Sequence, residues 1–107
     1  AVLARFPQVS GADEIWYDPG TNDFYLGANR MTSDGTTAGY PTPVIGVISA
    51  GGTRQVPRAT WLQNFATGGT TTNTHSVAVD PTNHQVFVPV AGVGVAVLAK
   101  TPSTTGL

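Results

Sequence analysis

The chain has 107 residues, a formal net charge of −1, no cysteine and 10% charged side chains, against about 25% in an ordinary soluble domain. This length allows one domain, or a part of a larger one, but not two domains with separate cores. The five basic residues are scattered along the chain, so no stretch could neutralise a run of phosphates, and a nucleic-acid partner is not expected.

Short apolar runs, separated by turn residues about every 8 to 12 positions, predict an all-β protein. Threonine, which is β-branched and suited to strands, occurs 16 times, whereas strong helix formers are scarce. The segment Val56–Phe65 lacks an apolar stripe of helical spacing and is interpreted as a loop followed by a strand. The expected strands are Val2–Phe6, Glu14–Asp18, Asp23–Ala28, Pro43–Ser49, Thr60–Ala66, Ser76–Asp80, Gln85–Val90 and Val93–Ala99.

The segments between these strands are rich in turn-forming residues. Gly51 and Gly52 predict a turn, and Asn29–Thr42 predicts a long loop. The longest apolar stretch, Val86–Ala99, is interrupted by proline and glycine and is shorter than the ~20 residues that span a bilayer, so membrane insertion is not expected. A Thr-rich, charge-poor surface is common in exported proteins, which favours an extracellular or periplasmic location. The start at Ala1, without an initiator methionine, indicates a processed product or a fragment.

An internal repeat relates two hairpins of the chain. Ile15–Pro19 followed by Phe24–Leu26 resembles Val77–Pro81 followed by Val86–Val88. Positions 18 and 80 are separated by 62 residues, and so are positions 25 and 87. The two hairpins therefore align without a gap.

The strands around these hairpins repeat as well. Val44–Ile48 resembles Val93–Val97 with a displacement of 49, so the first copy would hold 13 extra residues in its long loop. Val2–Phe6, before the first hairpin, resembles Trp61–Phe65, before the second. The strand order is then one outer strand, a set of four strands and a set of three.

This order predicts a β-propeller whose last blade takes its outer strand from the other end of the chain. Residues 1–107 would form a single all-β unit, with blade one at about 12–66 and blade two at about 74–99. Residues 2–6, from the same or another copy, would complete blade two. Stacked blades would bury inner strands such as Val93–Leu98 on both sides. A β-sandwich of seven or eight strands is the alternative.

Two phrases of the sequence resemble a known repeat family. Gly11–Gly20 and His75–Pro89 are similar to the repeats of bacterial YVTN-type β-propellers, relatives of the lactonase-like and NHL propellers. The resemblance extends over roughly Ala12 to Ala99. It implies a propeller that is either a binding scaffold or a carbohydrate or lactone hydrolase. The motif itself, Asp-Pro-x-x-Asn, shapes a hairpin and implies no chemistry.

Two blades are fewer than the roughly 4 to 8 of a closed propeller, so an apolar face would remain at each end. Several hundred Å² at about 25 cal/mol/Å² corresponds to on the order of 10 kcal/mol. The expected partners are therefore copies of the same chain or the remaining blades of a longer one. Three copies in a closed ring would give six blades.

Candidate binding residues gather at the expected channel mouth. Asp13, Glu14 and His75 would open the inner strands, and the displacement of 62 makes His75 equivalent to Asp13. Their oxygen and imidazole groups could hold Ca²⁺, Mg²⁺ or Zn²⁺. Such residues more often solvate a polar channel or cap a strand end, so a cation is a possible but not a required cofactor.

A second candidate is the long loop, where Tyr40 is the best exposed aromatic residue beside Arg30 and Asp34. It could bind a carbohydrate or another small molecule. Adjacent strand residues, such as Asp13 and Glu14, point to opposite faces of a sheet, so such neighbours are not expected to act together as a catalytic pair. We therefore expect a non-catalytic scaffold or binding module. The alternative is a lactonase-like hydrolase with a divalent cation as Lewis acid at the channel mouth.

Overall fold

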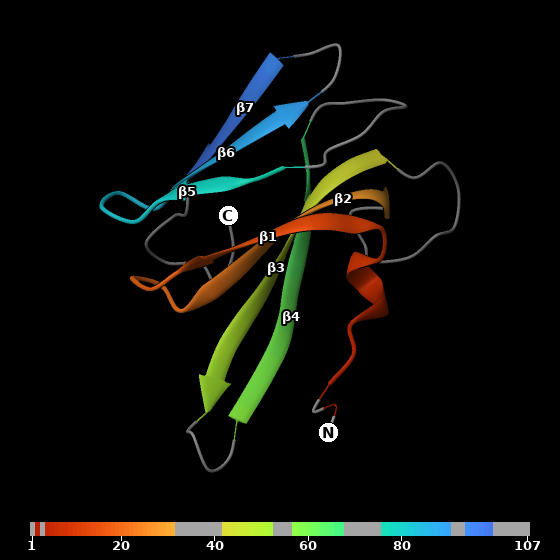
Figure 1. The fold of residues 1–107 in the computed structure, drawn as a ribbon, viewed down its shortest axis with the longest axis vertical. Coiled ribbons are helices and arrows are strands. Elements are labelled where there is room, and N and C mark those ends of the chain that lie inside the picture. Colours follow the sequence, from red (N-terminus) through yellow and green to blue (C-terminus); the bar gives the residue numbers. More distant parts are fainter. Residues whose placement is uncertain are drawn as a thin grey trace.

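The computed structural model describes residue 2 and residues 4–31, 42–52, 57–67, 76–90 and 94–99. Within these residues the chain forms two antiparallel sheets, which confirms the all-β class (Figure 1). Strands that follow one another in sequence are neighbours in each sheet, so both sheets are meanders. The first sheet contains β1 (Ala12–Asp18), β2 (Asp23–Met31), β3 (Thr42–Gly52) and β4 (Pro57–Ala66). The second sheet contains β5 (Ala78–Asp80), β6 (Gln85–Val90) and β7 (Gly94–Ala99).

The main core lies between the two sheets. In β6 every second residue is buried, as expected for a strand with one covered face. By contrast, residues 44–48 of β3 are all buried, because both faces of that strand are covered. The buried members of this core are Tyr25, Ile45 and Val47 from the first sheet and Val77, Val79, Val86, Val88 and Val90 from the second sheet and the segment before it.

A second, smaller core covers part of the other face of the first sheet. It is formed by the N-terminal segment, which contains a short 3₁₀ helix, η1 (Pro7–Val9). Val9 lies against Gly46, where an added Cβ atom would come within 2.4 Å of a Val9 methyl carbon. Glycine at this position therefore lets η1 approach β3 closely. The described residues contain no helix that is long and apolar enough to cross a membrane.

The buried Asn64 joins the N-terminal segment to β4. Its Oδ1 accepts a hydrogen bond of 3.0 Å from Trp61 Nε1, and its Nδ2 donates one of 2.7 Å to the backbone oxygen of Gln8. A buried amide with both ends paired avoids the cost of desolvating an unpaired polar group.

The structure corrects the N-terminal strand. Residues 2 and 4–6 lie outside any strand, because Phe6 packs with Val9 against the first sheet instead of extending along a sheet edge. The expected turn at Gly51 and Gly52 is also wrong. Both glycines belong to β3, and they pair with Arg58 and Pro57 at the start of β4.

The structure also corrects the alignment of the third strand of each sheet. Tyr25 pairs with Val47, and Phe87, its equivalent, pairs with Val97. Positions 47 and 97 differ by 50, not 49, so the first copy has 12 extra residues. A slip of one residue moves each side chain to the other face of the sheet.

The burial expected for the last strand is wrong as well. Val95 and Val97 of β7 are 64% and 52% exposed. One face of β7 packs against the first sheet through Ala96 and Leu98, but none of the described residues covers the other face.

Candidate functional site

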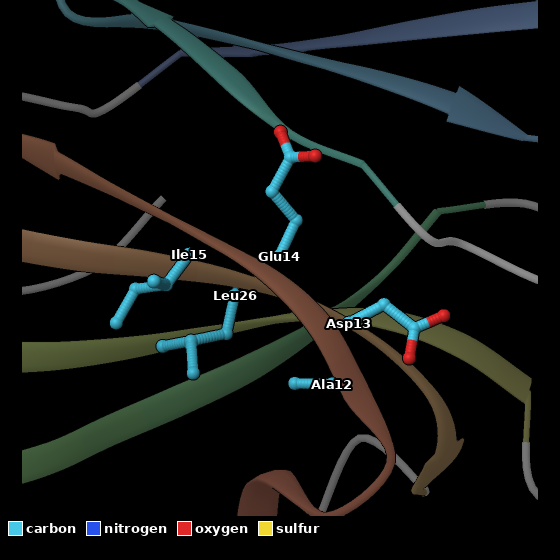
Figure 2. A pocket seen from close by; sticks show the side chains of 5 residues that line it. All are labelled: Ala12, Asp13, Glu14, Ile15 and Leu26. Atoms are coloured by element: carbon cyan, nitrogen blue, oxygen red, sulfur yellow. The ribbon is translucent and has the colours of Figure 1, made fainter.

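Asp13 and Glu14 lie at the start of β1, where the pairing with β2 is interrupted by a bulge. Ala12 pairs with Ala28 and Glu14 with Gly27, so Asp13 is the extra residue. Figure 2 shows the two carboxylates pointing in different directions, as expected for neighbours on a strand. Both side chains are exposed.

Glu14 points toward the second sheet (Figure 2). Its Oε1 lies 3.5 Å from the backbone nitrogen of Val77, at the limit of a hydrogen bond. Glu14 therefore lies at the junction of the two sheets.

A small open pocket lies beside these carboxylates. Its volume is about 200 Å³, and its lining is mostly apolar. Ligand pockets commonly enclose roughly 300–1,000 Å³, so this pocket is small for a complete ligand site. Its lining residues are Ala12, Asp13, Glu14, Ile15 and Leu26.

The remaining candidate residues are His75 and the predicted residues of the long loop, Arg30, Asp34 and Tyr40. His75, Asp34 and Tyr40 lie outside the described residues, and the backbone of Arg30 belongs to β2. In the described part of the chain, no group of three or more histidine, aspartate or glutamate side chains is placed to hold a metal ion. Within the described residues, the structure thus brings Asp13 and Glu14 of the predicted set together beside one pocket.

Asp18 organises the turn between β1 and β2. Its backbone oxygen accepts a hydrogen bond of 2.8 Å from the nitrogen of Asn22, and its Oδ1 accepts one of 2.9 Å from the nitrogen of Gly20. Asn22 has a φ of 58°, a left-handed conformation that asparagine tolerates well.

The turn between β5 and β6 has the same hydrogen bonds at positions 62 residues later. The backbone oxygen of Asp80 accepts a bond of 2.7 Å from the nitrogen of His84, and Asp80 Oδ1 accepts one of 2.9 Å from the nitrogen of Thr82. His84 has a φ of 61°. The repeat seen in the sequence is therefore also a repeat of turn geometry.

An ion pair joins the two turns, which lie on the same side of the molecule (Figure 1). His84 Nδ1 lies 2.6 Å from Oδ2 of the fully buried Asp18. Gly20 makes room for the imidazole, because a Cβ atom there would come within 2.2 Å of His84 Cε1. Asp18 thus uses one carboxylate oxygen for its own turn and the other for the neighbouring sheet.

Two groups at or beside the turns have shifted pKa values, Tyr25 in β2 and Asp80 at the end of β5. Burial raises the pKa of the Tyr25 hydroxyl; the Thr21 hydroxyl opposes this rise, and the carboxylates of Asp23 and Asp18 add to it. In the second turn, the hydroxyl and backbone nitrogen of Thr82 lower the pKa of Asp80.

The sequence interpretation gave His84 no role. Two signals point to it, however. His84 is equivalent to Asn22, at a turn position where asparagine, aspartate and histidine are enriched because they adopt a positive φ. Gly20 of the Asp-Pro-Gly turn also lacks the side chain that would otherwise fill the space of the imidazole.

Comparison of the chain with protein-family models, with curated proteins and with solved structures found no match.

Proposed function

We propose that the chain is a non-catalytic scaffold of the β-propeller type, in which the two sheets are successive blades. We further propose that it is a binding module of an exported protein, a location that its Thr-rich, charge-poor composition favours. The observation that carries the scaffold proposal is the equivalence of the two turns and the ion pair between them.

Three features support successive blades over a sandwich. Each sheet is a meander of consecutive strands, whereas strands of Greek-key sandwiches cross between sheets. The hairpins have the same turn at a constant displacement of 62 residues. Asp18 of one turn also contacts His84 of the next, so the two repeated turns themselves make a contact between the sheets.

A scaffold role fits the use of the polar residues. The buried carboxylate of Asp18 holds a turn and the adjoining sheet, and the buried amide of Asn64 holds the N-terminal segment. The small pocket beside Asp13 and Glu14 offers a surface for part of a carbohydrate or another small molecule.

The second candidate function is a metal-dependent hydrolase of the lactonase-like type. The observation that favours it is the placement of two carboxylates beside a pocket. In that case a divalent cation held by Asp13, Glu14 and additional ligands would act as the Lewis acid.

Metal content distinguishes these two functions. The purified chain is equilibrated with Ca²⁺, Mg²⁺ or Zn²⁺, dialysed and examined by elemental analysis, and its hydrolysis of a simple lactone is measured. Glu14→Ala is compared with Asp80→Asn, a control that also removes one carboxylate but retains the turn, since asparagine can accept the same backbone bond. The scaffold predicts no retained metal and no turnover. Stoichiometric metal that is lost in Glu14→Ala and kept in Asp80→Asn would overturn it.

A further inference from the structure

Both outward faces of the described residues are apolar. The first end face is the outer side of β1 and β2, where Ile15 is 56% and Tyr17 is 42% exposed beside the partly buried Phe24 and Leu26. The second end face is the outer side of the second sheet. Its apolar residues are Ala78, Phe87, Pro89, Val95, Val97 and Ala99, and Gln85 lies at its edge, paired with Ala99.

The residues of the second end face have buried equivalents in the first sheet. By the observed register, Val95 and Val97 correspond to Ile45 and Val47. Both of those residues are fully buried beneath the second sheet, whereas Val95 and Val97 are more than half exposed. The second end face thus repeats a surface that the molecule elsewhere covers with a sheet.

The first end face is equivalent to the inner side of the second sheet, which covers the first sheet inside the molecule. Ile15 and Tyr17 correspond to Val77 and Val79 by the displacement of 62. Val77 and Val79 are only 2% and 6% exposed because they pack against the first sheet. The second end face is thus equivalent to the side of the first sheet that faces the core, and the first end face to the side of the second sheet that packs on it.

The turns at the two ends are complementary as well. The internal junction pairs Asp18 with His84. The equivalents at the ends are Asp80, beside the second end face, and Asn22, in the turn at the first. An asparagine amide has two donor hydrogens, and Asn22 Nδ2 donates to Ala50 within its own sheet. Asn22 can thus donate to a carboxylate in the place that His84 occupies inside the molecule.

We infer that a second copy of this chain docks head to tail, with its first end face on the second end face of its neighbour and Asn22 beside Asp80. This inference rests on the proposed repeat scaffold. Because the two surfaces are different, the contact is heterologous, and a rotation that closes gives a ring. The roughly 4 to 8 blades of closed propellers correspond to about two to four copies.

The expected contact is small. The second sheet has three strands, and strand rise and spacing give it a flat area of roughly 20 × 14 Å. On the first sheet, the N-terminal segment covers part of the outer side with Phe6 and Val9, which leaves the part over β1 and β2 to the second copy. Standard interfaces bury about 800 Å² on each partner. One contact is therefore weak and depends on concentration, whereas ring closure gives every copy two contacts.

Native mass across protein concentrations tests association. Sedimentation equilibrium should show a wild-type chain that assembles as its concentration rises, and Val97→Asp should shift the assembly toward monomer by at least tenfold in concentration. Val2→Asp is the control, because Val2 is 65% exposed and belongs to neither end face. Circular dichroism checks that both variants are folded. A wild-type chain that stays monomeric at all concentrations would overturn the inference.

The cysteine-free sequence allows a test of which faces meet. Inside the molecule, position 20 touches His84; the equivalent positions in two copies are Thr82 of one and Asn22 of the other. Asn22→Cys and Thr82→Cys are prepared separately and then mixed under mild oxidation. Head-to-tail docking predicts a disulfide-linked mixed dimer in the mixture, and little in either variant alone.

Disulfides within a single-variant sample would instead show like faces in contact and would overturn the head-to-tail arrangement. These results are separable from the metal measurement. A monomeric chain without metal would refute docking between copies and leave the non-catalytic role intact. An assembling chain with a Glu14-dependent metal would refute the non-catalytic role and leave intact the repeat architecture on which the docking rests.

Discussion

Gly20→Ala tests whether the ion pair between the turns holds the two sheets together. The added Cβ atom would come within 2.2 Å of His84 Cε1, so the imidazole must move away from Asp18. The backbone itself accepts alanine, because Gly20 does not have a positive φ. The substitution thus acts on the contact between the sheets and not on the turn.

The expected loss of stability depends on how Asp18 and His84 are solvated once their contact is broken. A hydrogen bond to a charged group contributes roughly 1.5–3 kcal/mol to folding. Asp18 is fully buried, but the His84 side chain is 34% exposed and can exchange its bond for water. We therefore expect Gly20→Ala to lower the free energy of unfolding by about 1.5–2 kcal/mol. Urea unfolding followed by tryptophan fluorescence measures this difference.

A double-mutant cycle with His84→Ala provides the control. His84→Ala alone should cost at least as much, since it removes the same bond and also places alanine at a positive φ. In the double variant the clash is gone, so adding Gly20→Ala should cost almost nothing, and the two effects should be strongly non-additive. Wild-type stability in Gly20→Ala, or two penalties that simply add, would refute the assigned role of the ion pair.

Three further predictions concern other contacts. Gly46→Val places methyl groups against Val9 and should cost roughly 1–3 kcal/mol in urea unfolding, less in a Val9→Ala background. Asn64→Leu leaves the Trp61 indole without its acceptor, and a loss of about 1–3 kcal/mol is expected in the same assay; a neutral result would contradict the role of the buried amide. Asp80 has a lowered pKa in the folded state, so its stabilising contribution is present above its unfolded value of 3.8 and is lost as the pH falls through the folded pKa. Asp80→Asn should therefore make the free energy of unfolding less dependent on pH as the pH falls below 3.8, and an unchanged slope there would contradict this reasoning.

The hairpins could be predicted from the sequence because their signals are local. Asp18 and Asp80 each precede a proline and accept a backbone bond two residues later, and this geometry depends on few neighbours. The start of β4 was harder to predict from the sequence. Proline disfavours a strand interior, yet Pro57 begins β4 because β3 continues to Gly52 and supplies its pairing partner.

The register of β7 was assigned one residue out because only the valine positions Val44 and Val93 were matched. A displacement of 50 sets Ile45, Gly46, Val47 and Ile48 on Val95, Ala96, Val97 and Leu98, and is the better alignment of the two. The pairing of β7 with β6 has this register, and such pairing is tertiary information. The conformation of Val2–Phe6 could not be predicted either, because it also depends on tertiary packing. Only the folded first sheet offers the space beside Gly46 into which the following η1 packs.

The acidic pair was predicted in part. Strand alternation correctly separates Asp13 from Glu14, because it needs only local geometry. The bulge at Asp13 and the reach of Glu14 toward Val77 both depend on how the sheets pair and stack.

The shared turn geometry has a consequence for how such a chain can change its length. A duplicated gene segment that encodes one further unit would build its new junction from side chains already selected for an existing one. The ends would stay as they are, and stability would grow with the number of units, as in other repeat proteins. Longer descendants of the chain could therefore form their contacts between sheets without new core residues.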